Sequence, residues 1–141
     1  GCDYRVMAKG KYQIGLNEIA VGITLPKIIF DLYAFWLGQR KAYQNLMEAR
    51  MMMPDEALAD GLVDEVVDDS EVLSQAEAKM KTYLSFSQAS WTHSKSSTRK
   101  ELLEKLQNVD FDKDFNQTLE DWWLPENRKA MGKVVEMLKG R

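Results

Sequence analysis

One apolar segment, residues 25–37, constrains the fold of this chain more than any other. Its apolar residues recur at helical spacing on one face: Leu25, Ile28, Ile29, Leu32, Phe35 and Trp36. Phe30, Tyr33 and Ala34 make the other sides of this helix apolar as well. A helix that is apolar on several sides must be covered on several sides, so other elements have to pack around it. Pro26 suits its first turn and Gly38 its end.

Shorter elements are predicted on both sides of this helix. Residues 3–7 and 12–14 suit short extended pieces joined by a turn at residues 9–11. A helix over residues 39–49 should place Tyr43, Leu46 and Met47 inward, followed by an apolar connection at residues 51–53. A short helix should then open at Pro54 and end at Gly61, before a strand at residues 63–67.

The second half of the chain reads as a series of helices. Polar caps at residues 68–70 precede a helix that reaches about residue 86, with an expected inward face of Val72, Leu73, Ala76, Met80, Tyr83 and Leu84. Residues 87–99 fit either a loop or a loosely patterned helix. Leucines at 102–106 and aromatic residues at 111–123 mark two more helices. Pro125 opens the last one, whose apolar face is Met131, Val134, Val135 and Leu138.

Composition bounds the class of protein. A chain of 141 residues with 45% hydrophobic and 29% charged residues is typical of one globular domain. The net charge of −3 offers no basic patch for nucleic acid, and no apolar run is long enough to span a bilayer. The one cysteine, Cys2, excludes an internal disulfide and fits a reducing compartment, either the cytoplasm or an organelle matrix. The four Trp and eight Met predict broad apolar contacts, including contacts between subunits.

Three segments in fixed order carry a resemblance to a known family. The first, residues 2–22, ends in Ile14-Gly15-Leu16-Asn17-Glu18-Ile19-Ala20-Val21-Gly22. The second is Pro54-Asp55-Glu56-Ala57-Leu58-Ala59-Asp60-Gly61-Leu62-Val63-Asp64-Glu65-Val66-Val67, and the third is the helical tail over residues 122–141. Together they resemble the crotonase superfamily, the enoyl-CoA hydratases and isomerases.

This resemblance implies an α/β fold that is mostly helical with a few short strands. Residues 1–67 would form the end of the family's β-β-α spiral, and residues 68–141 its helical trimerisation region. The implied assembly is a homotrimer or a hexamer. Because the chain opens in what looks like the middle of a strand, we expect it to be the C-terminal part of a longer polypeptide or one chain of a divided protein. The N-terminal half of the protein is then a required partner.

The resemblance also assigns a site. In this family the Glu that matches Glu18 moves a proton at the carbon next to a thioester carbonyl. Such chemistry needs a base and donors that hold the developing oxyanion, and the family's two backbone donors precede the position that matches Cys2. We expect substrate contacts from Leu16, Asn17, Ile19 and Gly22, with backbone approaching the ligand at Gly15 and Gly22. The substrate would be a coenzyme A thioester of fatty acid metabolism, with no metal or redox cofactor.

The subclass stays open at this point. Leu16-Asn17 stands where many hydratases carry Gln-Pro, which resembles the mitochondrial Δ3,Δ2-enoyl-CoA isomerase type. A hydratase, which is a lyase, uses a second Glu whose position would fall a few residues before Cys2. A third interpretation is that this chain, when alone, is a non-catalytic module that supports oligomerisation and forms one wall of the pocket. We expect the isolated chain to be inactive under each of these readings.

Several other residues have simpler interpretations. Cys2 is expected to be a buried strand residue, and His93 a surface or capping residue. Asp110, Asp112 and Asp114 imitate a calcium loop, but Phe115 stands where that loop needs glycine, so they predict a solvated stretch before a helix. Two groups of basic residues could meet CoA phosphates, although surface charge clusters are the simpler interpretation. The first is Lys95, Arg99 and Lys100, and the second is Arg128, Lys129 and Lys133. The pair Trp122-Trp123 is expected in the core or at a subunit contact.

Overall fold

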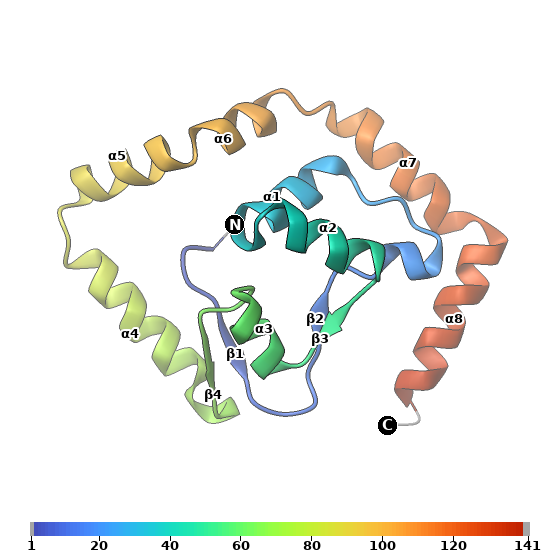
Figure 1. Ribbon diagram of the computed structural model, residues 1–141, viewed down its shortest axis with the longest axis horizontal. Helices are drawn as coiled ribbons and strands as arrows, with labels where there is room; N and C mark the ends of the chain where they lie inside the picture. Colours follow the sequence, from blue (N-terminus) through green and yellow to red (C-terminus); the bar gives the residue numbers. More distant parts are fainter. Residues whose placement is uncertain (1, 140–141) are drawn as a thin grey trace.

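The computed structural model describes residues 2–139. They form an N-terminal unit followed by a row of helices (Figure 1). The N-terminal unit, residues 2–67, contains the strands β1 (Val6–Ala8), β2 (Ile14–Gly15), β3 (Met51–Met52) and β4 (Glu65–Val67). Between them lie the 3-10 helix η1 (Glu18–Val21) and the helices α1 (Lys27–Leu37), α2 (Gln39–Met47) and α3 (Pro54–Asp60). The chain is thus mostly helical with a few short strands, as the sequence predicts.

The strands form two small pairs that bring distant segments together. β1 and β4 pair in parallel, with Val6 opposite Glu65, whereas β2 and β3 are antiparallel, with Ile14 opposite Met52. Arg5 strengthens the first pair, because its guanidinium holds the carboxylate of Asp64 through two hydrogen bonds of 2.9 and 3.0 Å. The same guanidinium lies 4.0 Å from the ring centroid of Trp36 on α1, which ties the strand pair to the central helix.

The core of the N-terminal unit is small and lies around α1 and α3. Its buried apolar side chains are Tyr33, Ala34, Ala42, Met52, Ala57, Leu62 and Val63. The alanines let the helices approach closely, and Met52 fills the space between them without any exposed surface. Gly61 ends α3 in the left-handed conformation, with φ of 78°, as the sequence predicts for this position.

The remaining helices form an arc around the N-terminal unit, which we call the helical arc (Figure 1). After the 3-10 turn η2 (Asp69–Glu71), it consists of α4 (Val72–Leu84), α5 (Gln88–Thr98), α6 (Lys100–Gln107), α7 (Phe111–Trp123) and α8 (Pro125–Lys139). It touches the N-terminal unit at separate places: α4 against β1, α6 against α1, and α8 against η1. None of the helices over residues 2–139 is long and apolar enough to cross a bilayer.

Some predicted inward faces are wrong. Tyr43 and Met47 are 60% and 48% exposed, because α2 instead turns Ala42, Asn45 and Leu46 toward the core. The predicted inward face of α4 is also wrong, since Leu73, Met80 and Leu84 are exposed along with Ala76. The physical reason is that α4 is covered on one side only, where it meets β1, and Val72 and Tyr83 are merely half-buried there.

The structure also tests the predictions for several single segments. Cys2 was expected in a buried strand, but it is exposed and precedes β1. The open choice for residues 87–99 is resolved as helix α5, which begins after Ser87. The expected apolar face of α8 includes Leu138, whose side chain lies outside the described part of the molecule. The division of the chain into two domains, residues 1–67 and 68–141, stays a prediction.

The packing at Gly15 predicts a measurable loss of stability on substitution. A Cβ atom at this position would overlap the backbone carbonyl oxygen of Arg50, next to the strand β3 with which β2 pairs. We expect Gly15→Ala to destabilise the protein by about 1–3 kcal/mol, because the two backbone segments have to move apart. Urea denaturation would measure this change.

The matched control for this substitution is Gly132→Ala in α8, where a Cβ atom meets nothing within 4 Å. That change should be neutral or stabilise the protein by about 0.5–1 kcal/mol, since glycine is a poor helix former. Equal denaturation midpoints for the two variants would contradict the proposed packing at Gly15.

Candidate functional site

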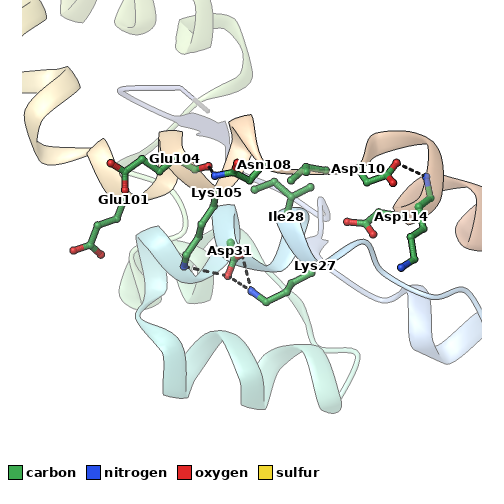
Figure 2. A pocket seen from close by; sticks show the side chains of 11 residues that line it. Lys27, Ile28, Asp31, Glu101, Glu104, Lys105, Asn108, Asp110 and Asp114 are labelled. Carbon is green, nitrogen blue, oxygen red and sulfur yellow. Dashed lines mark hydrogen bonds and ion pairs between the residues drawn. The ribbon is translucent and has the colours of Figure 1, made fainter.

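The larger of two candidate cavities lies between α1 and the helices α6 and α7 (Figure 2). It measures about 770 Å³ and is lined chiefly by charged side chains. Its buried carboxylate, Asp31, is already paired with Lys27 at 2.7 Å and approached by Lys105 at 3.6 Å. Asp110 in the same cavity caps α7 by accepting a hydrogen bond from the backbone N–H of Lys113. Asp31 and Asp110 are thus occupied in holding helices and are not free to act as an acid or a base.

Glu18 sits at the start of the 3-10 turn that follows β2. The turn is closed by Gly22, whose φ of 76° is the left-handed conformation that glycine adopts readily. The backbone carbonyl of Glu18 accepts a hydrogen bond of 3.0 Å from the N–H of Ile23, which fixes the backbone at this residue. Asn17 precedes the turn, and its side chain makes no capping hydrogen bond.

The carboxylate of Glu18 is unusual among the described side chains. Its Oε2 atom is buried and has no hydrogen-bond partner within residues 2–139. Buried polar atoms in proteins are nearly always hydrogen-bonded, and Glu18 is the only carboxylate among the four described side chains that have such an unpaired atom. A buried carboxylate without a fixed partner is free to accept a proton from another molecule.

The second cavity, of about 490 Å³, lies directly beside Glu18, and we call it the Glu18 cavity. The N-terminal unit contributes Asn17, Glu18, Val21 and Ile23 to its lining, and the helical arc contributes Trp122, Arg128, Met131, Gly132, Val134, Val135 and Glu136. This volume lies in the usual range for small-molecule sites, and the mixture of an apolar lining with a few polar groups is typical of them. The arrangement can hold an apolar chain next to a carboxylate base.

Side chains of α7 and α8 shape the far wall of the Glu18 cavity. The guanidinium of Arg128 lies 5.8 Å from the ring centroid of Trp122 and 5.4 Å from that of Trp123. Trp122 is 41% and Trp123 69% exposed, so neither lies in the core, and a role at a subunit contact stays a prediction. The sequence predicts one apolar face of Met131, Val134 and Val135 but gives no sign that this face meets Glu18. A glycine at position 132, in the middle of a helix, was the available signal.

Unlike Glu18 and Asn17, the other predicted substrate contacts do not line the Glu18 cavity. Leu16 packs against the core and lines a separate cavity with Tyr33 and Trp36, while Ile19 is partly exposed. Gly22 was expected to admit a ligand, yet a Cβ atom there would overlap the side chain of Asn127. The close approach at Gly22 is therefore between two segments of the chain. The roles of Leu16, Ile19 and Gly22 as substrate contacts stay predictions.

The remaining candidate residues have structural partners or lie at the surface. Lys95 and Arg99 both hold the carboxylate of Asp3, at 2.6 and 2.7 Å, so they serve the attachment of α5. His93 is exposed, in agreement with the predicted surface role. The described residues contain no group of three or more His, Cys, Asp or Glu side chains that could hold a metal ion.

Comparison with known proteins identifies the family of this chain. The profile of the enoyl-CoA hydratase/isomerase family matches residues 1–131. Mouse mitochondrial enoyl-CoA delta isomerase 1 is 41% identical over 106 residues, which are 74% of this chain and 37% of that protein. The rat enzyme of the same name matches to the same extent. The chain thus spans well under half the length of these curated relatives.

Solved structures give the same result for the fold. The crystal structure of human mitochondrial Δ3-Δ2-enoyl-CoA isomerase superposes with a TM-score of 0.82 at 29% identity, over 99% of this chain and 54% of that chain. A hydratase/isomerase family protein from Pseudomonas syringae superposes with a TM-score of 0.70, also at 29% identity, over 75% of this chain and 46% of that chain. On the family profile and these likenesses, the chain belongs to the enoyl-CoA hydratase/isomerase family, as its resemblance to the crotonases predicts.

Proposed function

We propose that this protein shifts the double bond of an enoyl-CoA from the 3 to the 2 position, with Glu18 as the proton shuttle. The observation that carries the proposal is the buried, unpaired Oε2 atom of Glu18 in a cavity with a largely apolar lining. Further support comes from the mouse relative, which is named an enoyl-CoA delta isomerase and is 41% identical over the shared region.

The proposed reaction needs one carboxylate that works twice. Glu18 takes a proton from C2, which lies between the thioester carbonyl and the double bond, and the electron pair left behind spreads onto the thioester oxygen. The protonated Glu18 then delivers the proton to C4, the electrons of the enolate form the new double bond between C2 and C3, and the carboxylate is restored. No atom is gained or lost, so the reaction needs no oxidant, reductant or water.

The environment of Glu18 supplies part of what this reaction requires. Val21, Ile23 and Met131 would surround the acyl chain, and Asn17 would contact the substrate near the base. Leu16, Ile19 and Gly22 are proposed as additional contacts. Donors for the developing oxyanion would come from the N-terminal half of the protein, as in relatives of this family. No metal or redox cofactor takes part in the proposed reaction, and coenzyme A enters as part of the substrate.

The hydratase alternative remains a candidate, because the matching family profile covers hydratases as well as isomerases. Addition of water across a 2-enoyl-CoA uses a second carboxylate to position the water. Glu136 of α8 also lines the Glu18 cavity, although its carboxylate is paired with Lys139 at 2.9 Å. The second carboxylate expected in a hydratase precedes the position of Cys2, and we favour the single-base isomerase because the mouse relative is named an enoyl-CoA delta isomerase.

We further propose the assembly and the compartment. A homotrimer or hexamer would follow the family pattern, with the exposed apolar side chains of the helical arc at subunit contacts. The curated relatives are mitochondrial by name, and a single exposed cysteine suits a reducing compartment, so we place the protein in an organelle matrix or the cytoplasm.

Replacing the base tests the central proposal. Glu18→Gln keeps the shape of the side chain but removes its ability to accept a proton. In the full-length protein we expect the rate of 3-enoyl-CoA isomerisation to fall by about 10²–10⁴-fold. A spectrophotometric assay would follow isomerisation, with hydration of 2-enoyl-CoA measured in parallel.

Glu120→Gln is the matched control for this experiment, because Glu120 is an exposed carboxylate of α7 away from the cavity lining. Its rate should equal that of the wild type. A Glu18→Gln rate within a few-fold of the wild type would refute the proposal. Hydration as fast as isomerisation in the wild type would instead favour the hydratase alternative.

The isolated chain should not turn over the substrate. Removing a single oxyanion donor costs about 10²–10³-fold in rate, and the family supplies both donors from segments before the position of Cys2. We therefore expect the 141-residue chain alone to be inactive in the assay in which the full-length protein is active. Turnover by the isolated chain at the rate of the full-length protein would show that the described residues contain a complete site.

The open space at Gly132 predicts control of acyl-chain length. Gly132 lines the Glu18 cavity, and nothing lies within 4 Å of the position of a Cβ atom. Gly132→Leu should fill this space, so kcat/KM for long acyl chains should fall about tenfold or more relative to short ones. Lys133→Leu, an exposed neighbour outside the cavity lining, should leave the ratio unchanged. Equal ratios in the two variants would place the acyl chain elsewhere.

A further inference from the structure

Two buried polar residues stand out in the helical arc. Among the side chains after Val67 that the structure describes, those of Asp121 and Asn127 alone are buried, each with 8% of its surface exposed. Both lie where α7 gives way to α8, next to the loop that follows Glu18. Because the described apolar side chains of the helical arc are at most partly buried, hydrogen bonds help to position it at this junction.

Asn127 connects α8 to the turn that carries Glu18. Its Nδ2 atom donates to the backbone carbonyl of Gly22 at 2.8 Å and to that of Asp121 at 2.9 Å. The lack of a side chain at Gly22 is what makes this contact possible, because a Cβ atom there would overlap the Asn127 amide. One side chain therefore joins two segments that lie 105 residues apart in the sequence.

Asp121 fixes the next part of the same loop. Its Oδ2 atom accepts a hydrogen bond of 2.8 Å from the backbone N–H of Thr24, and its Oδ1 atom accepts one of 3.0 Å from Gln117. Hydrogen bonds from Thr24, and then from Gln117, hold the pKa of the Asp121 carboxyl below its ordinary value, so the group is charged at neutral pH. The hydroxyl of Thr118 adds a hydrogen bond of 2.8 Å to the carbonyl of Thr24.

These bonds act on Glu18 through a short stretch of backbone. The N–H of Ile23 bonds to the carbonyl of Glu18, and its neighbours Gly22 and Thr24 are the two residues that α7 and α8 hold. The opposite wall of the Glu18 cavity belongs to α8. The same side chains thus fix the base and the wall that faces it in one arrangement.

We propose that Asp121 and Asn127 form a latch that holds the Glu18 turn and α8 in the geometry required for proton transfer. Neither residue lines the Glu18 cavity, so both are positioning residues rather than catalytic ones. This inference rests on the proposed function of Glu18. A small displacement of a reacting group can cost about 10²-fold in rate, which sets the size of the expected effect.

The test compares variants of the full-length protein that remove or keep the hydrogen bonds. Asn127→Ala and Asp121→Ala should each lower kcat for 3-enoyl-CoA isomerisation by about 10–100-fold. Asp121→Asn keeps an acceptor for Thr24, and its amide can still pair with Gln117, so it should retain most of the wild-type kcat. Asn116→Ala is the matched control, because Asn116 is exposed on α7 and makes no side-chain hydrogen bond within residues 2–139.

Hydrogen exchange provides a second readout that does not depend on turnover. Backbone amides of residues 22–24 and of the first turns of α8 should exchange faster in Asn127→Ala and Asp121→Ala than in the wild type, while the N-terminal core around α1 should be unchanged. Faster exchange everywhere, with normal kcat for the folded fraction, would mean a general loss of stability and would overturn the latch.

The outcomes separate the latch from the function on which it rests. If Glu18→Gln abolishes isomerisation while both alanine variants keep kcat within twofold of the wild type, the latch is overturned and the function stands. If Glu18→Gln stays active, the proposed function fails and the positioning role falls with it. Loss of kcat in both alanine variants, its recovery in Asp121→Asn, and local changes in exchange would together establish the latch.

Discussion

Polar contacts with three aspartates attach the helical arc to the N-terminal unit. Asp3 pairs with Lys95 of α5 and with Arg99 between α5 and α6, and Asp31 pairs with Lys105 of α6. Asp121 of α7 accepts a hydrogen bond from the backbone N–H of Thr24. No described apolar side chain after Val67 is buried, so burial of apolar surface contributes less here than in the N-terminal unit. Hydrogen bonds and ion pairs are directional, and they therefore fix the angle at which each helix lies as well as its distance.

The N-terminal unit and the helical arc are thus held in place by different interactions, and the Glu18 cavity lies between them. One wall of the cavity comes from the N-terminal unit, whose core is packed around α1, and the other comes from α8 at the end of the arc. A site between two bodies that are packed separately can be shaped by residues that never touch the ligand. Relatives within one family could then differ in the substrates they accept by changing the junction between α7 and α8, while the turn with the glutamate stays the same.

The sequence predicted where the helices lie better than which of their faces are covered. Helical periodicity located α1 and α2 closely, because the apolar residues that produce it belong to each helix itself. Pro54 and Gly61 marked the ends of α3, and Pro125 marked the start of α8. Periodicity failed for Tyr43 and for the inward face of α4, since it shows which side of a helix is apolar but not whether anything covers that side. Glu18 was located through the resemblance to a family and not through its own chemistry.

The latch residues had no such signal in the sequence. Asp121 and Thr24 are 97 residues apart, and hydrogen bonds between single polar residues leave no repeating pattern along the chain. Asp121 stands beside two tryptophans in a helix, where it reads as an ordinary exposed residue. What distinguishes it is burial, which depends on the complete fold. Gly22 offered no clear signal either, because its left-handed conformation already explains a glycine there and its contact with Asn127 cannot be read from the sequence.

The free oxygen of Glu18 has a consequence for how fast this side chain can turn. A carboxylate held by hydrogen bonds must break them before it rotates, whereas no described residue donates to Oε2 of Glu18. Its backbone is pinned by Ile23, so rotation about the side-chain torsions is the motion left to it. Side-chain conformers of exposed residues interchange in picoseconds to nanoseconds, and a carboxylate oxygen without a hydrogen bond lacks one of the barriers that slow this motion in buried residues. A proton carried between two carbon atoms could then move with the carboxylate without the breaking of any hydrogen bond to the described residues.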